Sequence, residues 1–223
     1  MKSAKIKWMY ISAVVLLPAV VVFLLMCRPA YYRRVPPFTA GSGQRQVGLY
    51  LTHELLASIY NNSQRCEPFD AVITQKAIND VMSLGEWPQE FGGIKFFKPE
   101  VFFSTDRAVL VGAANFNAVE LVLTVVAAAE FDAKGLLKLK LEKVRIGVLD
   151  VTLFAKMMAA GFSRRQFNPE DGENEDLRAK AVKSLLYGRP FEPVFSIDGK
   201  KVRVKKIDIV QRKAVIRIVP AGN

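Results

Sequence analysis

The chain has 223 residues and a formal net charge of +11, with one histidine and two cysteines. One histidine and two widely separated cysteines are too few for a typical zinc or redox centre, so we expect no metal site and no cofactor. The excess of lysine and arginine instead suits an anionic partner such as a membrane surface.

An apolar segment without any charge occupies residues 8–27 and follows several lysines. About 20 residues at roughly 1.5 Å each span a bilayer core of about 30 Å. A cleaved signal peptide would need a shorter apolar core and a small-x-small motif, and a lipoprotein motif would need a small residue in place of Met26 before Cys27. We therefore expect residues 1–27 to be a signal anchor with a transmembrane helix, in a single-pass inner (cytoplasmic) membrane protein.

Residues 28–43 form a linker that contains proline, glycine and arginine. Prolines stiffen such a segment and glycines loosen it, and the linker arginines Arg28, Arg33 and Arg34 can contact anionic lipid headgroups. These arginines nearly balance the N-terminal lysines, so the positive-inside rule gives little information on orientation. A short N-terminal tail usually stays in the cytosol, which places residues 44–223, as one domain, in the periplasm or at the cell exterior.

Two amphipathic helices are predicted at the start of this domain. Residues 44–60 carry apolar side chains at helical spacing. The second helix begins after Thr74 as N-cap and ends near Gly85. Its expected buried residues are Ala77, Ile78, Val81 and Met82.

Strand patterns follow in residues 94–103, with an interruption at Pro99, and in residues 108–116 and 119–131. A turn with the sequence DAKG then leads into a strand from Leu136. Together these runs predict neighbouring antiparallel strands.

The positions of the apolar residues also predict β-bulges. In the strand from Leu136, the apolar parity changes at Glu142 and Lys143, and the C-terminal strand repeats the change at Lys205 and Lys206. A shift of one residue inside a strand indicates a bulge, which bends the sheet.

Two further helices are predicted in residues 152–162 and 173–187, before a hairpin turn at Asp198 and Gly199. The expected fold is α+β: an N-terminal transmembrane helix followed by a strongly curved, bulged antiparallel β-sheet packed on amphipathic helices. We expect about six or seven strands in one sheet, with the helices on one side of it.

The segments VITQKAINDVM, GLLKLKLEKVRIGVLDV and FSIDGKKVRVKKIDIVQRKAVIRIVP occur in an order that resembles the YpmS-like family of membrane-anchored bacterial proteins. That family has an N-terminal anchor, an extracytoplasmic domain and no assigned reaction. More remotely, a helix wrapped by a coiled antiparallel sheet resembles the tubular lipid-binding (TULIP, SMP-like) architecture. This resemblance implies binding of a lipid or another apolar ligand in a groove between sheet and helices, and it supplies no catalytic residues.

The strand at residues 119–131 has apolar side chains on both faces. Either both faces belong to the core of a central strand, or one face lines a groove. Small residues on two neighbouring strands would leave width for an acyl chain, with phenylalanine and methionine as walls. The predicted groove residues are Phe96, Phe97, Phe102, Phe103, Ala113, Leu121, Leu123, Val125, Ala127, Ala129, Met157 and Met158.

We therefore expect a membrane-anchored envelope protein that binds a lipid or another apolar ligand. The alternative is a non-enzymatic scaffold or adaptor that docks an envelope protein on an exposed sheet edge or basic face and has a tightly filled interior. An enzyme is not expected, because no nucleophile elbow, phosphate-binding loop, dinucleotide motif or metal-ligand cluster is present. Nucleic acid is not an expected partner, since the C-terminal basic residues alternate with apolar ones and no recognition module is evident.

Overall fold

The computed structural model describes residues 20, 23–27, 56–91, 94–116, 119–157 and 177–221. Among these residues, no helix is both long and apolar enough to cross a membrane. Most of the predicted transmembrane segment and all of the predicted linker lie outside the described residues. The described part of the segment is Val20, a short helix at residues 23–26, and Cys27.

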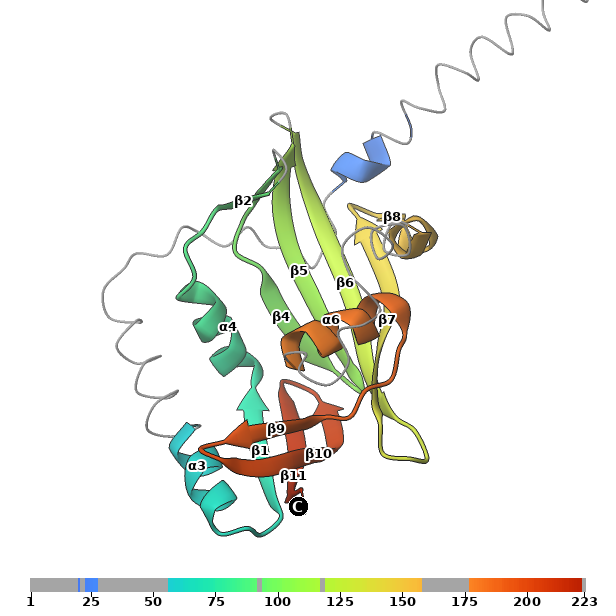
Figure 1. Ribbon diagram of the computed structural model, residues 1–223. Coiled ribbons are helices and arrows are strands. Elements are labelled where there is room, and N and C mark those ends of the chain that lie inside the picture. The colour runs from blue at the N-terminus through green and yellow to red at the C-terminus, as the bar shows by residue number, and fades with distance from the viewer. Residues whose placement is uncertain are drawn as a thin grey trace, which may run out of the picture.

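The larger of two antiparallel sheets has seven strands in the order β2-β3-β5-β6-β7-β8, and β4 also pairs with β5 (Figure 1). These strands are β2 (Gln89–Phe91), β3 (Ile94–Phe96), β4 (Glu100–Ser104), β5 (Arg107–Phe116), β6 (Val119–Phe131), β7 (Leu137–Ile146) and β8 (Leu149–Asp150). The interruption that Pro99 predicts is confirmed, because β3 ends before it and β4 begins after it.

The smaller sheet has four strands in the order β1-β11-β10-β9. Its strands are β1 (Phe69–Thr74), β9 (Val194–Ile197), β10 (Lys200–Val210) and β11 (Lys213–Pro220). The expectation of one sheet is therefore wrong. The C-terminal strands pair with β1, which was not predicted as a strand, instead of joining the larger sheet.

The described residues include the helices α3 (Leu56–Gln64), α4 (Gln75–Ser83) and α6 (Leu177–Tyr187). A further helix begins at Thr152 and is described as far as Met157. The predicted N-cap of α4 is confirmed, since the Thr74 side chain accepts a hydrogen bond of 3.2 Å from the backbone N–H of Ala77. Val81 was expected to be buried, but 37% of its surface is exposed.

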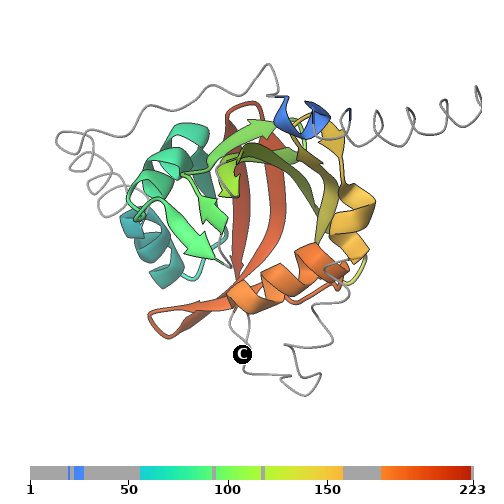
Figure 2. The same ribbon diagram turned by 90° about the horizontal axis from the view of Figure 1, so that it is seen from above.

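Both predicted bulges are confirmed. In the pairing of β7 with β6 the register skips Glu142. In the pairing of β10 with β11 it skips Lys205, between Val204 and Lys206. An extra residue in one strand increases its twist and bends it, and both sheets are strongly curved (Figure 2).

The two sheets share a core at one end of the molecule, where β10 and β11 cross the concave side of the larger sheet (Figure 2). Val101 and Phe103 of β4 pack there with Ile209 of β10 and Ala214 of β11. Ile78 and Met82 of α4 pack against the same cluster. The smaller sheet therefore covers only part of the concave side.

Helix α4 closes the outer edge of β4 through side-chain amides. Asn79 Oδ1 accepts a hydrogen bond from the backbone N–H of Val101 at 2.7 Å, and Asn79 Nδ2 donates to its carbonyl oxygen at 2.8 Å. Gln75 Oε1 accepts from the N–H of Phe103 at 3.0 Å. These groups take the place of a neighbouring strand and satisfy the exposed edge.

Helix α6 closes the opposite edge of the larger sheet, along β7. Ser184 Oγ accepts a hydrogen bond of 2.8 Å from the backbone N–H of Leu139, and Phe191 forms an isolated bridge with Leu137. The helices α4 and α6 therefore lie along two opposite edges of the sheet (Figure 2). The expectation that all helices lie on one side is wrong, because the backbone groups at both edges of the sheet also need hydrogen-bond partners.

Candidate functional site

One face of β5, β6 and β7 is apolar at every paired position. We call this the inner face, because Ala108 and Leu110 on it pack against the core shared with the smaller sheet. Its residues are Ala108, Leu110, Gly112 and Ala114 on β5, Leu121, Leu123, Val125, Ala127 and Ala129 on β6, and Leu139, Leu141, Val144 and Ile146 on β7. A continuous apolar surface therefore runs along three adjacent strands.

The inner face of β6 is half-buried from Leu121 to Ala129, whereas the opposite face combines three buried residues with the half-buried Val126 and the exposed Glu130. On the opposite face Val122, Thr124 and Ala128 are 2%, 3% and 9% exposed. A central strand enclosed by core on both faces would have both sets buried. Along β6 the inner face thus keeps accessible apolar surface, while Ala114, Leu141 and Val144 on the neighbouring strands are buried. Exposure of apolar surface to water costs about 25 cal/mol per Å².

Two predicted phenylalanines join the inner face. Phe96 of β3 pairs with Ala114, and Phe103 of β4 pairs with Ala108. Paired residues of adjacent strands point to the same side of a sheet. The structure therefore brings these phenylalanines to the same surface as the five predicted residues of β6.

The other predicted groove residues that the structure describes do not lie on the inner face. Ala113 pairs with Val122 and Phe102 pairs with Val109, which places both on the opposite face. Phe97 lies between β3 and β4 and is 38% exposed. Met157 is 67% exposed and so does not fill a groove. Met158 and the predicted membrane-surface residues Arg28, Arg33 and Arg34 lie outside the described residues.

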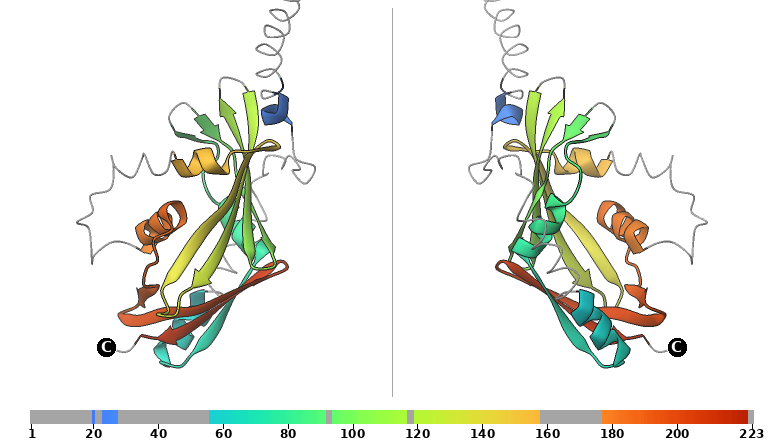
Figure 3. Two further views of the ribbon diagram at one scale, coloured as in Figure 1. Left: turned by 90° about the vertical axis from the view of Figure 1, so that its right-hand side faces the viewer. Right: turned by 90° about the vertical axis from the view of Figure 1, so that its left-hand side faces the viewer.

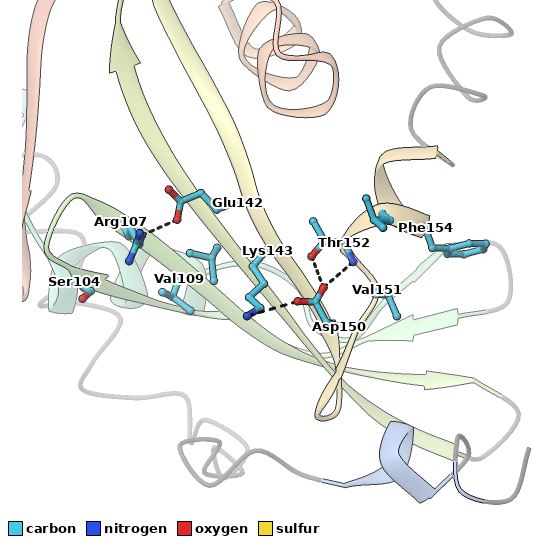
Figure 4. Close-up of a pocket in the computed structure, with 11 residues that line it drawn as sticks. Ser104, Arg107, Val109, Glu142, Lys143, Asp150, Val151, Thr152 and Phe154 are labelled. Carbon is cyan, nitrogen blue, oxygen red and sulfur yellow. Dashed lines mark hydrogen bonds and ion pairs between the residues drawn. The ribbon is translucent and has the colours of Figure 1, made fainter. Parts of the chain in front are cut away.

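A depression of ≈ 1020 Å³ lies on the face opposite the inner face, and we call it the outer depression (Figure 4). Val109 and Val126 form part of its apolar lining. The complete lining is Ser104, Arg107, Val109, Val126, Glu142, Lys143, Asp150, Val151, Thr152, Leu153 and Phe154. The sequence did not predict this depression. The available signal was the bulge at Glu142, because bulges redirect side chains.

The charged groups of the outer depression pair with one another (Figure 4). Arg107 Nε lies 2.6 Å from Glu142 Oε2, and Lys143 Nζ lies 3.5 Å from Asp150 Oδ2. Hydrogen bonds from the hydroxyl and the backbone N–H of Thr152 lower the pKa of Asp150, with a smaller contribution from Lys143. A carboxylate that is held ionised in this way is a poor proton donor at neutral pH.

Chemically, the outer depression offers ion pairs, whereas the inner face offers a long apolar surface. Among the residues that the structure describes, no group of three metal-ligating side chains comes together. No protein-family model matches the chain, and no curated protein matches its sequence. Its function is therefore inferred from the geometry of the chain itself.

Proposed function

We propose that the chain is a non-enzymatic, membrane-anchored envelope protein that binds a lipid or another apolar ligand on the inner face of its larger sheet. In this proposal, residues 8–27 hold it in the inner (cytoplasmic) membrane and the domain faces the periplasm or the cell exterior. This arrangement is that of the YpmS-like family, and the binding mode is that of the tubular lipid-binding architecture.

The observation that carries the proposal is the incomplete burial of an entirely apolar surface. The inner face of β6 is half-buried from Leu121 to Ala129, while Val122 and Ala128 on its other face are buried. Accessible apolar surface of this extent favours an apolar occupant. The scaffold alternative, by contrast, predicts a filled interior.

The dimensions of the inner face suit an acyl chain. At roughly 3.3 Å per residue, the stretch of β6 from Leu121 to Ala129 is about 26 Å long. The hydrocarbon of one bilayer leaflet, half of a core of about 30 Å, is about 15 Å thick. Ala127 and Ala129 are small, half-buried residues at one end of this stretch, next to Ala108, which packs against the core shared with the smaller sheet. The inner face is therefore long enough for a lipid tail.

Two adjacent alanines of β6 provide a matched test. Ala127 is half-buried on the inner face, and Ala128 is buried on the opposite face. The full chain would be purified in a mild detergent, and bound lipid would be counted by native mass spectrometry. We expect Ala127→Phe to fill the ligand space, so that bound lipid is lost while the fold is retained. Ala128→Phe should overfill packed surroundings at a cost of about 1–3 kcal/mol and should keep its lipid.

The experiment also has an outcome that rejects the proposal. The wild-type chain would be offered a fluorescent fatty acid and a phospholipid after its native lipids are removed. If it binds neither, and if both alanine variants lose similar stability, the inner face is ordinary core. The scaffold alternative would then remain.

A further inference from the structure

The helix that begins at Thr152 exposes three large apolar side chains. Leu153, Phe154 and Met157 are 82%, 60% and 67% exposed. Their spacing places them on one side of the helix, and Lys156, which is also exposed, flanks them. Leu153 and Phe154 also border the outer depression. Clustered apolar exposure of this kind marks an interaction surface.

A second set of exposed apolar residues lies at the same end of the molecule. Phe23 and Met26 of the short N-terminal helix are 67% and 52% exposed, and Val148 in the β7–β8 turn is 46% exposed. The backbone N–H of Val148 donates a hydrogen bond of 3.2 Å to the carbonyl oxygen of Leu24. Figures 1 and 3 show the short helix, β8 and the helix from Thr152 together at this end. We call these residues the apolar end: Phe23, Met26, Val148, Leu153, Phe154 and Met157.

The opposite end of the larger sheet is polar. The β6–β7 turn exposes Asp132 and Lys134, and the β4–β5 turn exposes Thr105 and Asp106. The β6–β7 turn lies at the far end from the N-terminal helix (Figure 1). One end of the sheet thus exposes apolar side chains and the other exposes polar ones. This difference is expected if only the apolar end is buried in a membrane.

We infer that the apolar end is seated in the interfacial layer of the bilayer, with Leu153, Phe154 and Met157 among the acyl chains. This inference rests on the membrane anchor of the proposed function. The segment of residues 8–27, which has no charge, ends at Cys27, directly after Met26 of the apolar end. The end of the anchor therefore fixes the position of the membrane surface beside the β7–β8 turn.

The chemistry of the helix from Thr152 matches a bilayer interface. Interfacial helices bury an apolar face at the boundary of headgroups and acyl chains and keep basic residues at the phosphates. Lys156 is placed to lie at the lipid phosphates, because anionic headgroups attract its positive charge. The inner face also reaches this end, since Ile146 pairs with Leu149 on either side of the β7–β8 turn. A lipid on the inner face would thereby lie next to the bilayer from which it comes.

The test measures the depth of a spin label on the full chain. The chain, with Cys27→Ser and Cys66→Ser, is reconstituted in discs of phosphatidylcholine and phosphatidylglycerol and labelled at Leu153→Cys. A matched sample carries the label at Lys134→Cys, in the polar turn. We expect the label at position 153 to have high accessibility to oxygen and low accessibility to a water-soluble nickel chelate. The label at position 134 should have high accessibility to the nickel chelate and lower accessibility to oxygen.

Either of two results overturns the inference. Equal nickel accessibility at both positions places the helix in water. Low accessibility to both reagents at position 153 means that protein, including a second copy of this chain, covers the helix. Adding Phe154→Ser and Met157→Ser should raise nickel accessibility at position 153, and these exposed substitutions should leave the fold unchanged.

The two proposals can fail separately. A deep label at position 153 together with an inner face that binds no lipid rejects the proposed function and leaves the membrane contact. Suppose instead that Ala127→Phe abolishes lipid binding while the label at position 153 is exposed to water. This result rejects the membrane contact and leaves the binding function.

Discussion

Ser184 Oγ accepts a hydrogen bond of 2.8 Å from the backbone N–H of Leu139, and Ser184 itself is 0% exposed. β7 has β6 along one side, while β8 pairs only with Arg145 and Ile146 on the other. The hydroxyl therefore replaces a strand at this edge. We expect Ser184→Ala to leave a buried N–H without its partner, which costs about 1–3 kcal/mol. Urea unfolding followed by tryptophan fluorescence measures the loss.

An exposed serine serves as the control for this prediction. Ser196 lies on β9 with its side chain in solvent, and Ser196→Ala should change stability by no more than about 0.5 kcal/mol. Equal effects of the two substitutions would mean that the Ser184 bond does not hold the edge of β7.

Asn79 makes the corresponding contact at the other edge, where its amide bonds both the N–H and the carbonyl of Val101. Asn79→Ala removes both bonds from a partly buried position. At about 1 kcal/mol for each bond, the expected loss is about 2 kcal/mol. Asn62→Ala is a suitable comparison, because the side-chain amide of Asn62 bonds to Ser58 within its own helix. A loss at Asn79 no larger than at Asn62 would contradict the proposed role of this amide.

Features set by neighbouring residues could be predicted from the sequence. The bulges at Glu142 and Lys205 follow from a change of parity within one strand, and the Thr74 cap follows from a local hydrogen bond. The Asp198-Gly199 turn is also confirmed, with φ values of 47° and 78° that suit a two-residue hairpin. Each of these signals lies within a few residues.

Features set by distant residues could not be predicted. Phe69–Thr74 forms β1 by pairing with β11, far along the chain, and its alternation was too short to separate it from the following helix. Asn79 and Ser184 look like ordinary polar residues of helices until the sheet edges are placed beside them. The faces of Phe102 and Ala113 depend on the register between strands, which neither residue type reveals.

The pKa of the Asp150 carboxyl group should lie below its ordinary value. The hydroxyl and the N–H of Thr152 stabilise its charged form and lower its pKa below the ordinary value of 3.8. A lowered folded-state pKa stabilises the protein above the unfolded pKa, and this contribution is lost as the pH falls through the folded value. We expect Thr152→Val to raise the pKa toward 3.8, and Thr152→Ser to keep it low. Carbon NMR of the labelled carboxyl measures the titration, and identical midpoints in all three proteins would refute the hydrogen-bond explanation.

The orientation of the domain can be tested with a native thiol. Cys66 is a free, exposed cysteine, whereas Cys27 is half-buried beside the short N-terminal helix. If residues 44–223 face away from the cytosol, a membrane-impermeant maleimide should label Cys66 in intact cells or, where an outer membrane is present, in spheroplasts. Cys66→Ser should remove most of the label, and Ser196→Cys in that background should restore it, because Ser196 is exposed on the edge strand β9. A cytosolic protein with an exposed thiol must stay unlabelled in the same sample. Labelling of Cys66 that begins only after lysis would place the domain in the cytosol, and the proposed envelope function would have to be abandoned.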